Sequence, residues 1–357
     1  MSITRRSLLA RLAAGAGTAA LPFPTWAEAG SPAFVAAAKE PSGDYALCGL
    51  TEMGEIAFRV PLPGRGHAAA AHPERAEAVA FARRPGTFAL VLDCAGGRVL
   101  HRLESPEGRH FYGHGAFLDE GRVLATTENL WETGEGRIAF WDASDGYRRM
   151  GDAPSGGIGP HELVRLPGTE ILAVANGGIR THPDSDREKL NIGTMRPNLS
   201  YLEDGRIVEQ VELTPELRLN SIRHLSVRED GTVAMAMQWE GSETDLVPLL
   251  ALHRRGGAPR LRQAPDADHA PLLAYAGSVS FSGDGARVAI TGPKGSAAHV
   301  FDADGDGPPA IVRRPDICGV AAAGTGFAFT DGTGGVIGPA GAHKHAVAWD
   351  NHLVAIG

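Results

Sequence analysis

The fold is decided by residues 111–127, which read FYGHGAFLDEGRVLATT. Phe111–Leu118 and Arg122–Thr127 are short apolar runs, and the turn Asp119–Gly121 joins them as in an antiparallel hairpin. Two further runs follow in the same unit: Gly136–Trp141 and Tyr147–Gly151. Long segments with helical periodicity are missing after the first 30 residues, so the sequence predicts an all-β protein built from units of four strands.

The unit is repeated along the chain. Gly66-His67, Gly113-His114 and Pro160-His161 stand 47 residues apart, at the start of the first strand of successive units. The same position recurs at longer and shorter steps further along: Arg223-His224, Gly277-Ser278, Cys318-Gly319 and Asn351-His352. A period of about 40 to 50 residues with four strands is typical of β-propeller blades. We therefore predict a seven-bladed β-propeller.

The last unit lacks room for its outer strands, because Asn351–Ile356 is followed only by Gly357. Three strand-like runs near the N-terminus supply them: Phe34–Ala38, Tyr45–Leu50 and Ile56–Val60. The N- and C-terminal strands are thus predicted to share one blade, which closes the ring and removes free sheet edges.

Histidine occupies the first-strand position in five of the seven units, and these strands line the central channel of a propeller. The predicted ring consists of His67, His114, His161, His224 and His352. Neutral imidazole suits iron, copper and zinc, so a metal site is one interpretation of this ring. A water-filled polar lining and a site for a small ligand are the other two. Glu162 follows His161 directly, and strict strand alternation predicts that the two side chains point to opposite faces.

Two other segments carry polar residues outside the repeat. Gly177–Pro197 is a long insertion between the second and third strands of the third unit, and we expect a lid, a docking loop or a plain surface turn there. Asp302–Gly307 is similar to the start of a calcium-binding loop, but it lacks the terminal glutamate and is predicted to be a hairpin turn. The usual hydrolase, zinc-protease, phosphate-loop and dinucleotide motifs are absent from the sequence.

The N-terminal residues predict export. Thr4-Arg5-Arg6-Ser7-Leu8-Leu9 is a twin-arginine pattern before an apolar stretch, and Ala27-Glu28-Ala29 fits a cleavage site. We therefore expect a signal peptide over 1–29, a single propeller domain over 30–357 and a periplasmic location. No other apolar run reaches membrane-spanning length, and a net charge of −8 excludes a nucleic-acid binder. A monomer is expected.

The motifs FYGHGAF, ATTENLW, GGIGPHEL, VANGGIRTHPD, REKLN, IRHLS and WDNHL occur in this order. Together they resemble a bacterial family of twin-arginine-exported propellers, a domain of unknown function in the quinoprotein-like or YVTN-like group. The resemblance covers nearly the whole chain after the leader. Members are commonly encoded near imelysin-type and dihaem oxidoreductase-like proteins, which implies a role in iron uptake with periplasmic iron-uptake proteins as partners. Beside the five histidines, the resemblance marks further polar positions: Glu128, Asn129, Glu162, Asn176, His182, Asn191, Gln238, Trp239 and Asn351.

These observations lead to one main hypothesis and two alternatives. The main hypothesis is a periplasmic propeller that binds a metal or a partner in iron acquisition, with iron or copper held by the histidine ring. The first alternative is a metal-dependent oxidoreductase or lyase that uses the same site, which requires an open coordination position and a substrate pocket. The second is an interaction scaffold that holds no metal. The sequence assigns no catalytic residue.

Overall fold

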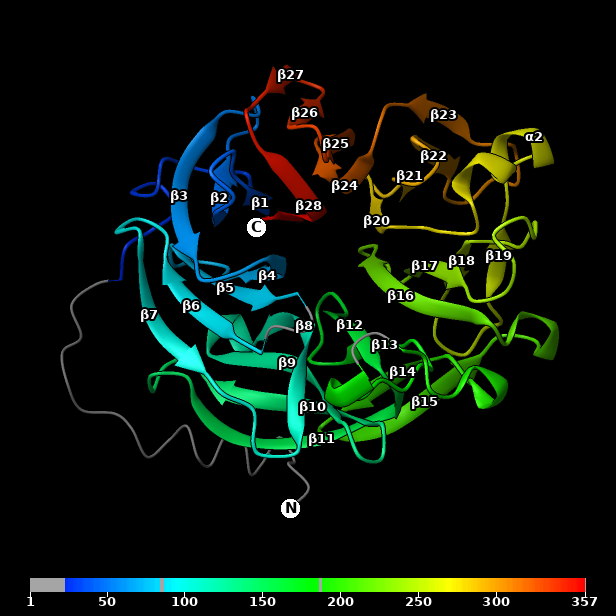
Figure 1. The fold of residues 1–357 in the computed structure, drawn as a ribbon, viewed down its shortest axis with the longest axis horizontal. Helices are drawn as coiled ribbons and strands as arrows, with labels where there is room; N and C mark the ends of the chain where they lie inside the picture. Colours follow the sequence, from blue (N-terminus) through cyan, green and yellow to red (C-terminus); the bar gives the residue numbers. More distant parts are fainter. Residues whose placement is uncertain (1–22, 84–86, 186–187, 357) are drawn as a thin grey trace.

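The computed structural model describes residues 23–83, 87–185 and 188–356. The chain forms seven four-stranded antiparallel sheets arranged as blades around a central channel (Figure 1). The innermost strands of neighbouring blades contact one another around this channel. The predicted all-β, seven-bladed propeller is thereby confirmed. The twin-arginine pattern, Thr4–Leu9, lies outside the described residues.

The first four blades follow the chain, and each begins with its innermost strand. Blade 1 contains β4 (Gly66–Ala71), β5 (Glu77–Ala82), β6 (Ala89–Asp93) and β7 (Arg98–Leu103). Blade 2 contains β8 (Arg109–Leu118), β9 (Val123–Leu130), β10 (Glu135–Asp142) and β11 (Arg148–Ile158). Blade 3 contains β12 (Pro160–Arg165), β13 (Leu172–Asn176), β14 (Asn198–Glu203) and β15 (Arg206–Glu212). Blade 4 contains β16 (Asn220–Val227), β17 (Val233–Trp239), β18 (Leu250–His253) and β19 (Arg260–Arg262).

The remaining three blades complete the ring. Blade 5 contains β20 (Ser278–Phe281), β21 (Arg287–Gly292), β22 (Ala297–Asp302) and β23 (Ala310–Arg313). Blade 6 contains β24 (Ile317–Ala323), β25 (Gly326–Asp331), β26 (Gly335–Gly338) and β27 (Gly341–Lys344). Blade 7 contains β28 (Ala348–Ala355), β1 (Phe34–Lys39), β2 (Tyr45–Leu50) and β3 (Ile56–Leu62). Short helical turns lie in the connections: η1 (Asp119–Gly121), η2 (Pro183–Ser185), η3 (Ile192–Thr194), η4 (Pro215–Leu217), α2 (Asp266–His269) and η5 (Ala270–Leu272).

Blade 7 closes the ring as predicted. β28, near the C-terminus, is the innermost strand and pairs antiparallel with β1, from Phe34 opposite Ala355 to Lys39 opposite Ala348. Main-chain hydrogen bonds between the two ends of the chain therefore hold the ring shut.

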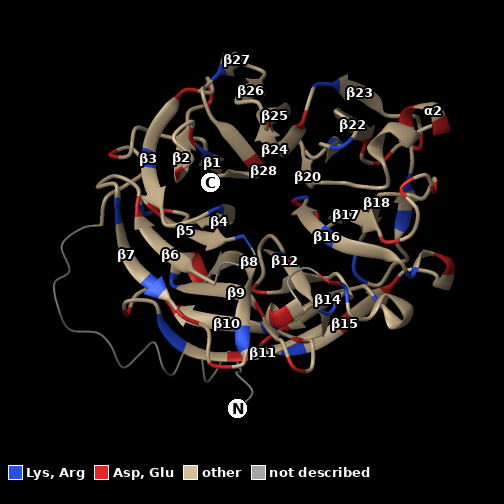
Figure 2. Cartoon of the chain, viewed as in Figure 1, with Lys and Arg blue, Asp and Glu red and all other residues tan. Residues whose placement is uncertain are grey.

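Burial explains the composition of the strands. The second strand of a blade is covered by neighbouring blades on both faces, so β5 is buried along its whole length and reads EAVAFA. The outermost strand, β7, reads RVLHRL and is mostly exposed. The innermost strand, β4, reads GHAAAA, because seven strands converge at the channel and leave room for small side chains. Figure 2 shows Lys, Arg, Asp and Glu distributed around the ring in loops and outer strands.

Some strand limits differ from the prediction. The outer strand of blade 2, predicted over Tyr147–Gly151, is β11 and continues to Ile158. The inner strand β8 begins at Arg109, two residues before the predicted Phe111. Both extensions contain polar or glycine residues whose backbone joins the sheet although no apolar pattern marks them. The Asp204-Gly205 turn connects β14 and β15 with φ of 49° and 73°, the left-handed conformations that a two-residue type I′ hairpin requires.

The described residues just before β1 pack on blade 1. The indole Nε1 of Trp26 donates a hydrogen bond to the carbonyl of His72 at 2.9 Å, and Ala76 N–H donates to the carbonyl of Pro24 at 2.7 Å. Ala29 is buried in the core beside β3 and β5. The predicted cleavage site, Ala27–Ala29, belongs to this packed segment. Among the described residues no helix has the length and apolar character needed to cross a membrane.

Candidate metal centre

Interruptions in strand pairing bring the histidines into the channel. In β12, Pro160 pairs with Asn176 and Glu162 pairs with the adjacent Ala175, so His161 is an extra residue, a β-bulge. The pairing of β4, β8, β16 and β28 is interrupted in the same part of each strand. β24, which has Gly319 at this position, is interrupted there too, whereas β20, which has Ser278, pairs without interruption. Because a bulge bends its strand and redirects a side chain, the repeated bulges aim the imidazoles at the channel axis.

The five histidines form one compact cluster. The ring centroids of His67 and His352 lie 4.6 Å apart, and His114 and His224 each lie 4.7 Å from His352. His161 lies 4.7 Å from His224 and 5.1 Å from His114. Most of these ring pairs meet edge to face. The structure therefore brings together all five members of the predicted ring.

The donor atoms of this cluster fit a metal ion. Among the described residues, two sets of three have donor atoms within 4.8 Å of one another: His67, His114 and His161, and His114, His224 and His352. Nitrogens bound to one ion at about 2.1 Å lie at most about 4.2 Å apart, so small ring rotations complete either set. His114 belongs to both sets and is the centre of the cluster.

Unpartnered nitrogens strengthen this fit. Four buried ring nitrogens have no hydrogen-bond partner among the described residues: His67 Nδ1, His114 Nε2, His161 Nδ1 and His352 Nε2. An unpaired buried polar atom carries a desolvation cost of about 1–3 kcal/mol. The two histidine sets could hold a metal ion.

Glu162 connects two of the histidines. Its Oε2 accepts hydrogen bonds from Nδ1 of His224 at 3.1 Å and from the backbone N–H of Leu225 at 3.0 Å. Its Oε1 lies 3.5 Å from Nδ1 of His114. Strand alternation predicted that Glu162 and His161 point to opposite faces, but the bulge at His161 breaks the alternation and lets both reach the cluster.

The electrostatics of the cluster favour neutral imidazoles. Burial, followed by repulsion from neighbouring imidazoles, lowers the pKa values of His67, His161 and His352 well below the usual histidine range. Burial also lowers the pKa of His224, against the opposing pull of Glu162. Burial alone would raise the pKa of the Glu162 carboxyl, but its contacts with His114 and His224 lower that pKa far below its usual value. Neutral imidazole is the protonation state that binds metals.

The cluster lies between two cavities. The first, which we call the wide cavity, has a volume of about 620 Å³ and is lined by the residues that follow the histidines in the inner strands, together with His114, His224 and His352. The second, which we call the loop-face cavity, has a volume of about 180 Å³ and is lined by His67, His161 and His224 with residues of the 177–197 insertion. The histidine cluster is therefore reachable from both sides of the ring.

Two of the other predicted residues lie close to the cluster. Gln238 and Asn351 line the loop-face cavity with His67 and His161. Gln238 Nε2 donates to the carbonyl of Ala276 at 3.2 Å, and Asn351 Nδ2 lies 3.4 Å from the hydroxyl of Tyr275. Both side chains face the same cavity as the imidazoles and can contact a ligand there.

Two further predicted residues, Glu128 and Asn176, form hydrogen bonds within and between the blades. Glu128 is fully buried and is held by Arg149 at 2.5 and 2.9 Å, with Arg109 at 3.5 Å. Asn176 is also fully buried, and its Nδ2 donates to the carbonyl of Ser155 and to Oδ1 of Asn198. The contacts of Glu128 join strands of blade 2, whereas the bond from Asn176 to Ser155 joins blade 3 to blade 2. Neither side chain lines the cavities beside the histidines.

The last four predicted residues lie away from the metal sets. Asn191 holds the insertion together, because its Oδ1 accepts from the N–H of Arg180 at 2.7 Å and its Nδ2 donates to the carbonyl of Gly178 at 2.9 Å. His182 lies in the insertion, with its Nε2 3.5 Å from the carboxylate of Glu132. Trp239 lies at the end of β17 and donates a hydrogen bond to Asp245 at 2.8 Å. Asn129 is buried near the end of β9, and its side chain has no hydrogen-bond partner among the described residues. Residues 186–187 of the insertion are outside the described residues.

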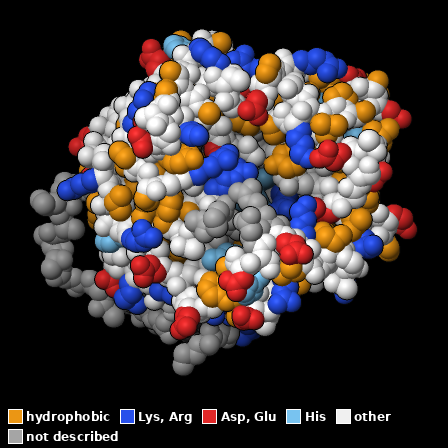
Figure 3. Space-filling view, in the orientation of Figure 1, with side chains coloured by type: hydrophobic (Ala, Val, Ile, Leu, Met, Phe, Trp, Pro, Cys, Tyr) orange, Lys and Arg blue, Asp and Glu red, His pale blue; other side chains and the backbone are white. Residues whose placement is uncertain are grey.

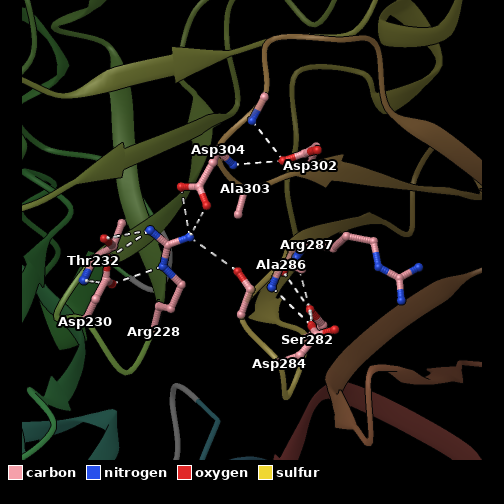
Figure 4. Close-up of polar contacts among 12 residues, drawn as sticks. Arg228, Asp230, Thr232, Ser282, Asp284, Ala286, Arg287, Asp302, Ala303 and Asp304 are labelled. Carbon is pink, nitrogen blue, oxygen red and sulfur yellow. Dashed lines mark hydrogen bonds and ion pairs between the residues drawn. The ribbon is translucent and has the colours of Figure 1, made fainter.

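The Asp302–Gly307 segment forms a turn that contacts Arg228, a residue that lines the wide cavity. The carboxylate of Asp302 accepts the backbone N–H groups of Asp304 at 2.9 Å and Gly305 at 2.8 Å. Arg228 reaches across from blade 4 and binds both Asp304 and Asp230 at 2.9 Å (Figure 4). The carboxylates are engaged by N–H groups and a guanidinium instead of converging on one point, which is the pattern of a hairpin turn.

Sequence reasoning overlooked the basic residues beside the cluster. Arg83, Arg223 and Lys189 are not among the predicted site residues, although all three line the loop-face cavity. Arg223 directly precedes His224, so its position in the repeat was a usable signal. Lys189 belongs to an insertion outside the repeat and gave none. On the face shown in Figure 3, Lys and Arg side chains gather around the centre of the ring.

The fold is similar to that of solved structures. Hydrazine synthase from Kuenenia stuttgartiensis is similar with a TM-score of 0.61 and 12% identity, covering 81% of this chain and 86% of that chain. A protein of unknown function from Bacteroides caccae matches with a TM-score of 0.47 and 11% identity, over 80% of this chain and 93% of that one. At such identities the likeness concerns the fold alone. No curated protein sequence matches. The family described as "Protein of unknown function (DUF1513)" matches residues 60–356, and the chain therefore belongs to the DUF1513 family.

Proposed function

We propose that this protein binds one transition-metal ion in the channel through the histidine cluster. The observation that carries the proposal is the set of four buried imidazole nitrogens without partners, contributed by His67, His114, His161 and His352. Interior packing alone gives no reason to collect them at one point, because each costs free energy when left unpaired.

Iron or copper is the proposed metal. Imidazole nitrogens suit iron, copper and zinc, whereas calcium and magnesium prefer oxygen. The cysteines do not contribute thiolates, because Cys48, Cys94 and Cys318 are buried in the blades outside both donor sets. Glu162 supports His114 and His224 from behind, as carboxylates commonly support metal-bound histidines.

We further propose that the protein acts in the periplasm, in the handling of iron, together with periplasmic iron-uptake proteins. The support for this setting is the twin-arginine pattern at Thr4–Leu9 and the resemblance to exported propellers encoded beside iron-regulated genes. Fractionation of cells that produce the full chain, with intact-mass analysis of the recovered protein, tests export and the predicted cleavage after Ala29.

Metal content tests the central proposal. The full chain is purified without chelators or a histidine tag, and bound metals are measured by elemental mass spectrometry. We expect about one equivalent of iron or copper, and we expect His114→Ala to lose it because His114 belongs to both donor sets. His101→Ala is the matched control, since His101 is exposed on the outer strand β7. A metal-free protein that also refuses added iron, copper and zinc would refute the proposal and favour an interaction scaffold.

The wide cavity favours a second candidate, a metal-dependent oxidoreductase. Its volume of about 620 Å³ is within the range of roughly 300–1,000 Å³ typical of pockets for small molecules. It reaches His114, His224 and His352, so a substrate there could approach the ion. Electron paramagnetic resonance of the metal-loaded protein, before and after a small reductant and then dioxygen, tests this candidate. An ion that never changes oxidation state would exclude redox turnover.

A further inference from the structure

The loop-face cavity is a small polar chamber directly against the histidine cluster. His67, His161 and His224 form its floor, and Ile179, Thr181 and Lys189 of the insertion line it from the other side. Its volume of about 180 Å³ is below the roughly 300–1,000 Å³ of pockets for drug-sized ligands. A ligand that fits here has only a few non-hydrogen atoms.

The charged side chains that line this cavity are positive apart from the titratable histidines. Arg83, Lys189 and Arg223 line it, and no carboxylate belongs to its lining among the described residues. Asp350 and Glu240 lie behind the cations. Each carboxylate contacts two cations. Asp350 binds Arg83 at 3.0 Å and also binds Arg65. Glu240 binds Lys189 and lies 3.6 Å from Arg223. The lining therefore carries excess positive charge that favours an anion.

Neutral polar groups complete the walls. The cavity is also lined by Tyr112, Gln238, Tyr275 and Asn351. The hydroxyl of Tyr275 lies within reach of Nδ2 of Asn351 at 3.4 Å, and accepting that bond leaves its own proton able to donate to a ligand. Two guanidinium groups suit a carboxylate in particular, because their planar forks match its two oxygens.

We propose that the loop-face cavity binds a small carboxylate anion, held by Arg83, Lys189 and Arg223 and placed against the metal ion beside His67 and His161. The contact with the ion rests on the function proposed above, whereas the anion site itself depends only on the cavity. In this arrangement the histidines bind the ion from within the ring, and a carboxylate oxygen from the loop face takes a coordination position that they leave open. The two ligands then bind cooperatively, each raising the affinity of the other.

Calorimetric titration with oxalate tests the anion site in metal-free protein. The full chain is treated with a chelator, exchanged into buffer of fixed ionic strength and titrated beside the variants Lys189→Gln and Arg223→Gln. We expect saturable binding to the unaltered protein, weakened about tenfold or more in each variant, since each removes a charge-assisted hydrogen bond. Arg165→Gln is the matched control, because Arg165 lines the wide cavity and loses the same charge. Arg165→Gln should change the oxalate affinity by less than about twofold, because solvent and salt screen a charge at that distance from the anion site.

Each result decides one part of the proposal. Absence of saturable binding in the metal-free protein, or equal weakening in Arg165→Gln, overturns the anion site. Arg223 is nearly buried, so circular dichroism checks the fold of its variant, and the half-exposed Lys189 gives an independent readout if that fold is lost. Repeating the titration with iron-loaded protein tests the contact with the ion, and an unchanged oxalate affinity would reject it. Metal content is measured separately, so failure of the metal site and failure of the anion site are distinguishable.

Discussion

Nδ1 of His224 in β16 donates a hydrogen bond of 3.1 Å to Oε2 of Glu162 in β12, the inner strand of the preceding blade. The low pKa of Glu162 keeps this carboxyl ionised, so it only accepts, and the proton of His224 must reside on Nδ1. The other carboxylate oxygen lies 3.5 Å from Nδ1 of His114. One carboxylate thus orients two histidines and leaves Nε2 of each as the ring nitrogen that could hold a metal.

Replacing Glu162 with glutamine should weaken metal binding by about 10- to 100-fold, because partners of metal-bound histidines contribute about this much. A glutamine of equal size keeps the packing but removes the negative charge that orients His114 and His224. Competition with a chelator of known affinity measures the change. Glu170→Gln, at an exposed turn between β12 and β13, is the control and should leave the affinity unchanged. If Glu162→Gln and Glu170→Gln bind the metal with equal affinity, Glu162 does not support the metal site.

The metal-free protein should lose stability as the pH falls below about 6.5, the ordinary histidine pKa. The folded-state pKa values of His67, His161, His224 and His352 are depressed, so the unfolded chain binds more protons in this range. The stability contributed by neutral imidazoles is present above that pH. It is lost as the pH falls towards the folded-state values, by up to about 1.4 kcal/mol per pH unit for each histidine.

Urea unfolding at pH 7.5, 6.5 and 5.5 measures this slope. His72 and His299 also have pKa values lowered to about 4 and add to the total. His352→Asn isolates the ring, because it removes one titrating group of the cluster and should make the slope shallower. The Glu162 carboxyl does not interfere, since its stabilisation is lost only below its ordinary pKa of about 4.3. A slope equal to that of the unaltered protein would contradict the depressed pKa of His352.

Asn176→Ala should destabilise the fold by about 2 kcal/mol or more and leave metal content unchanged. Its amide bonds the carbonyl of Ser155 at 3.0 Å and Oδ1 of Asn198 at 2.9 Å, while its Oδ1 accepts from the hydroxyl of Ser155 at 2.7 Å. All of these groups are buried, and removing one partner leaves the others unsatisfied at about 1–3 kcal/mol. Chemical denaturation and elemental analysis are the two measurements. Loss of metal with unchanged stability would instead place Asn176 at the ion.

The cysteines should be unreactive in the folded protein. Cys48, Cys94 and Cys318 are free and buried, and burial raises the pKa of each thiol to about 12. A thiol reagent at pH 8 should therefore label none of them in native buffer and all three in denaturant. Addition of a reductant should leave the melting temperature unchanged, because no disulfide is present. Rapid labelling of the native protein at any of the three positions would contradict this placement.

The sequence by itself determined the fold and the membership of the ring. Each blade is encoded by a continuous stretch of sequence, in which apolar runs of strand length are separated by turn residues, except that the last blade combines both ends of the chain. The first-strand position recurs in every unit. The spacing of His67, His114 and His161 was therefore enough to place the histidines on successive inner strands. Closure by the two ends of the chain followed from counting strands.

Tertiary structure alone decided how these residues meet. The bulge at His161, which brings Glu162 to His114 and His224, cannot be read from strand alternation, because it is set by how neighbouring blades pack around the channel. The loop-face cavity likewise joins Arg83, Lys189 and Arg223 from three separate blades. Local patterns specify each strand. Distances between side chains of different blades arise only when the ring closes, so the donor sets and the charge beside them belong to the tertiary structure.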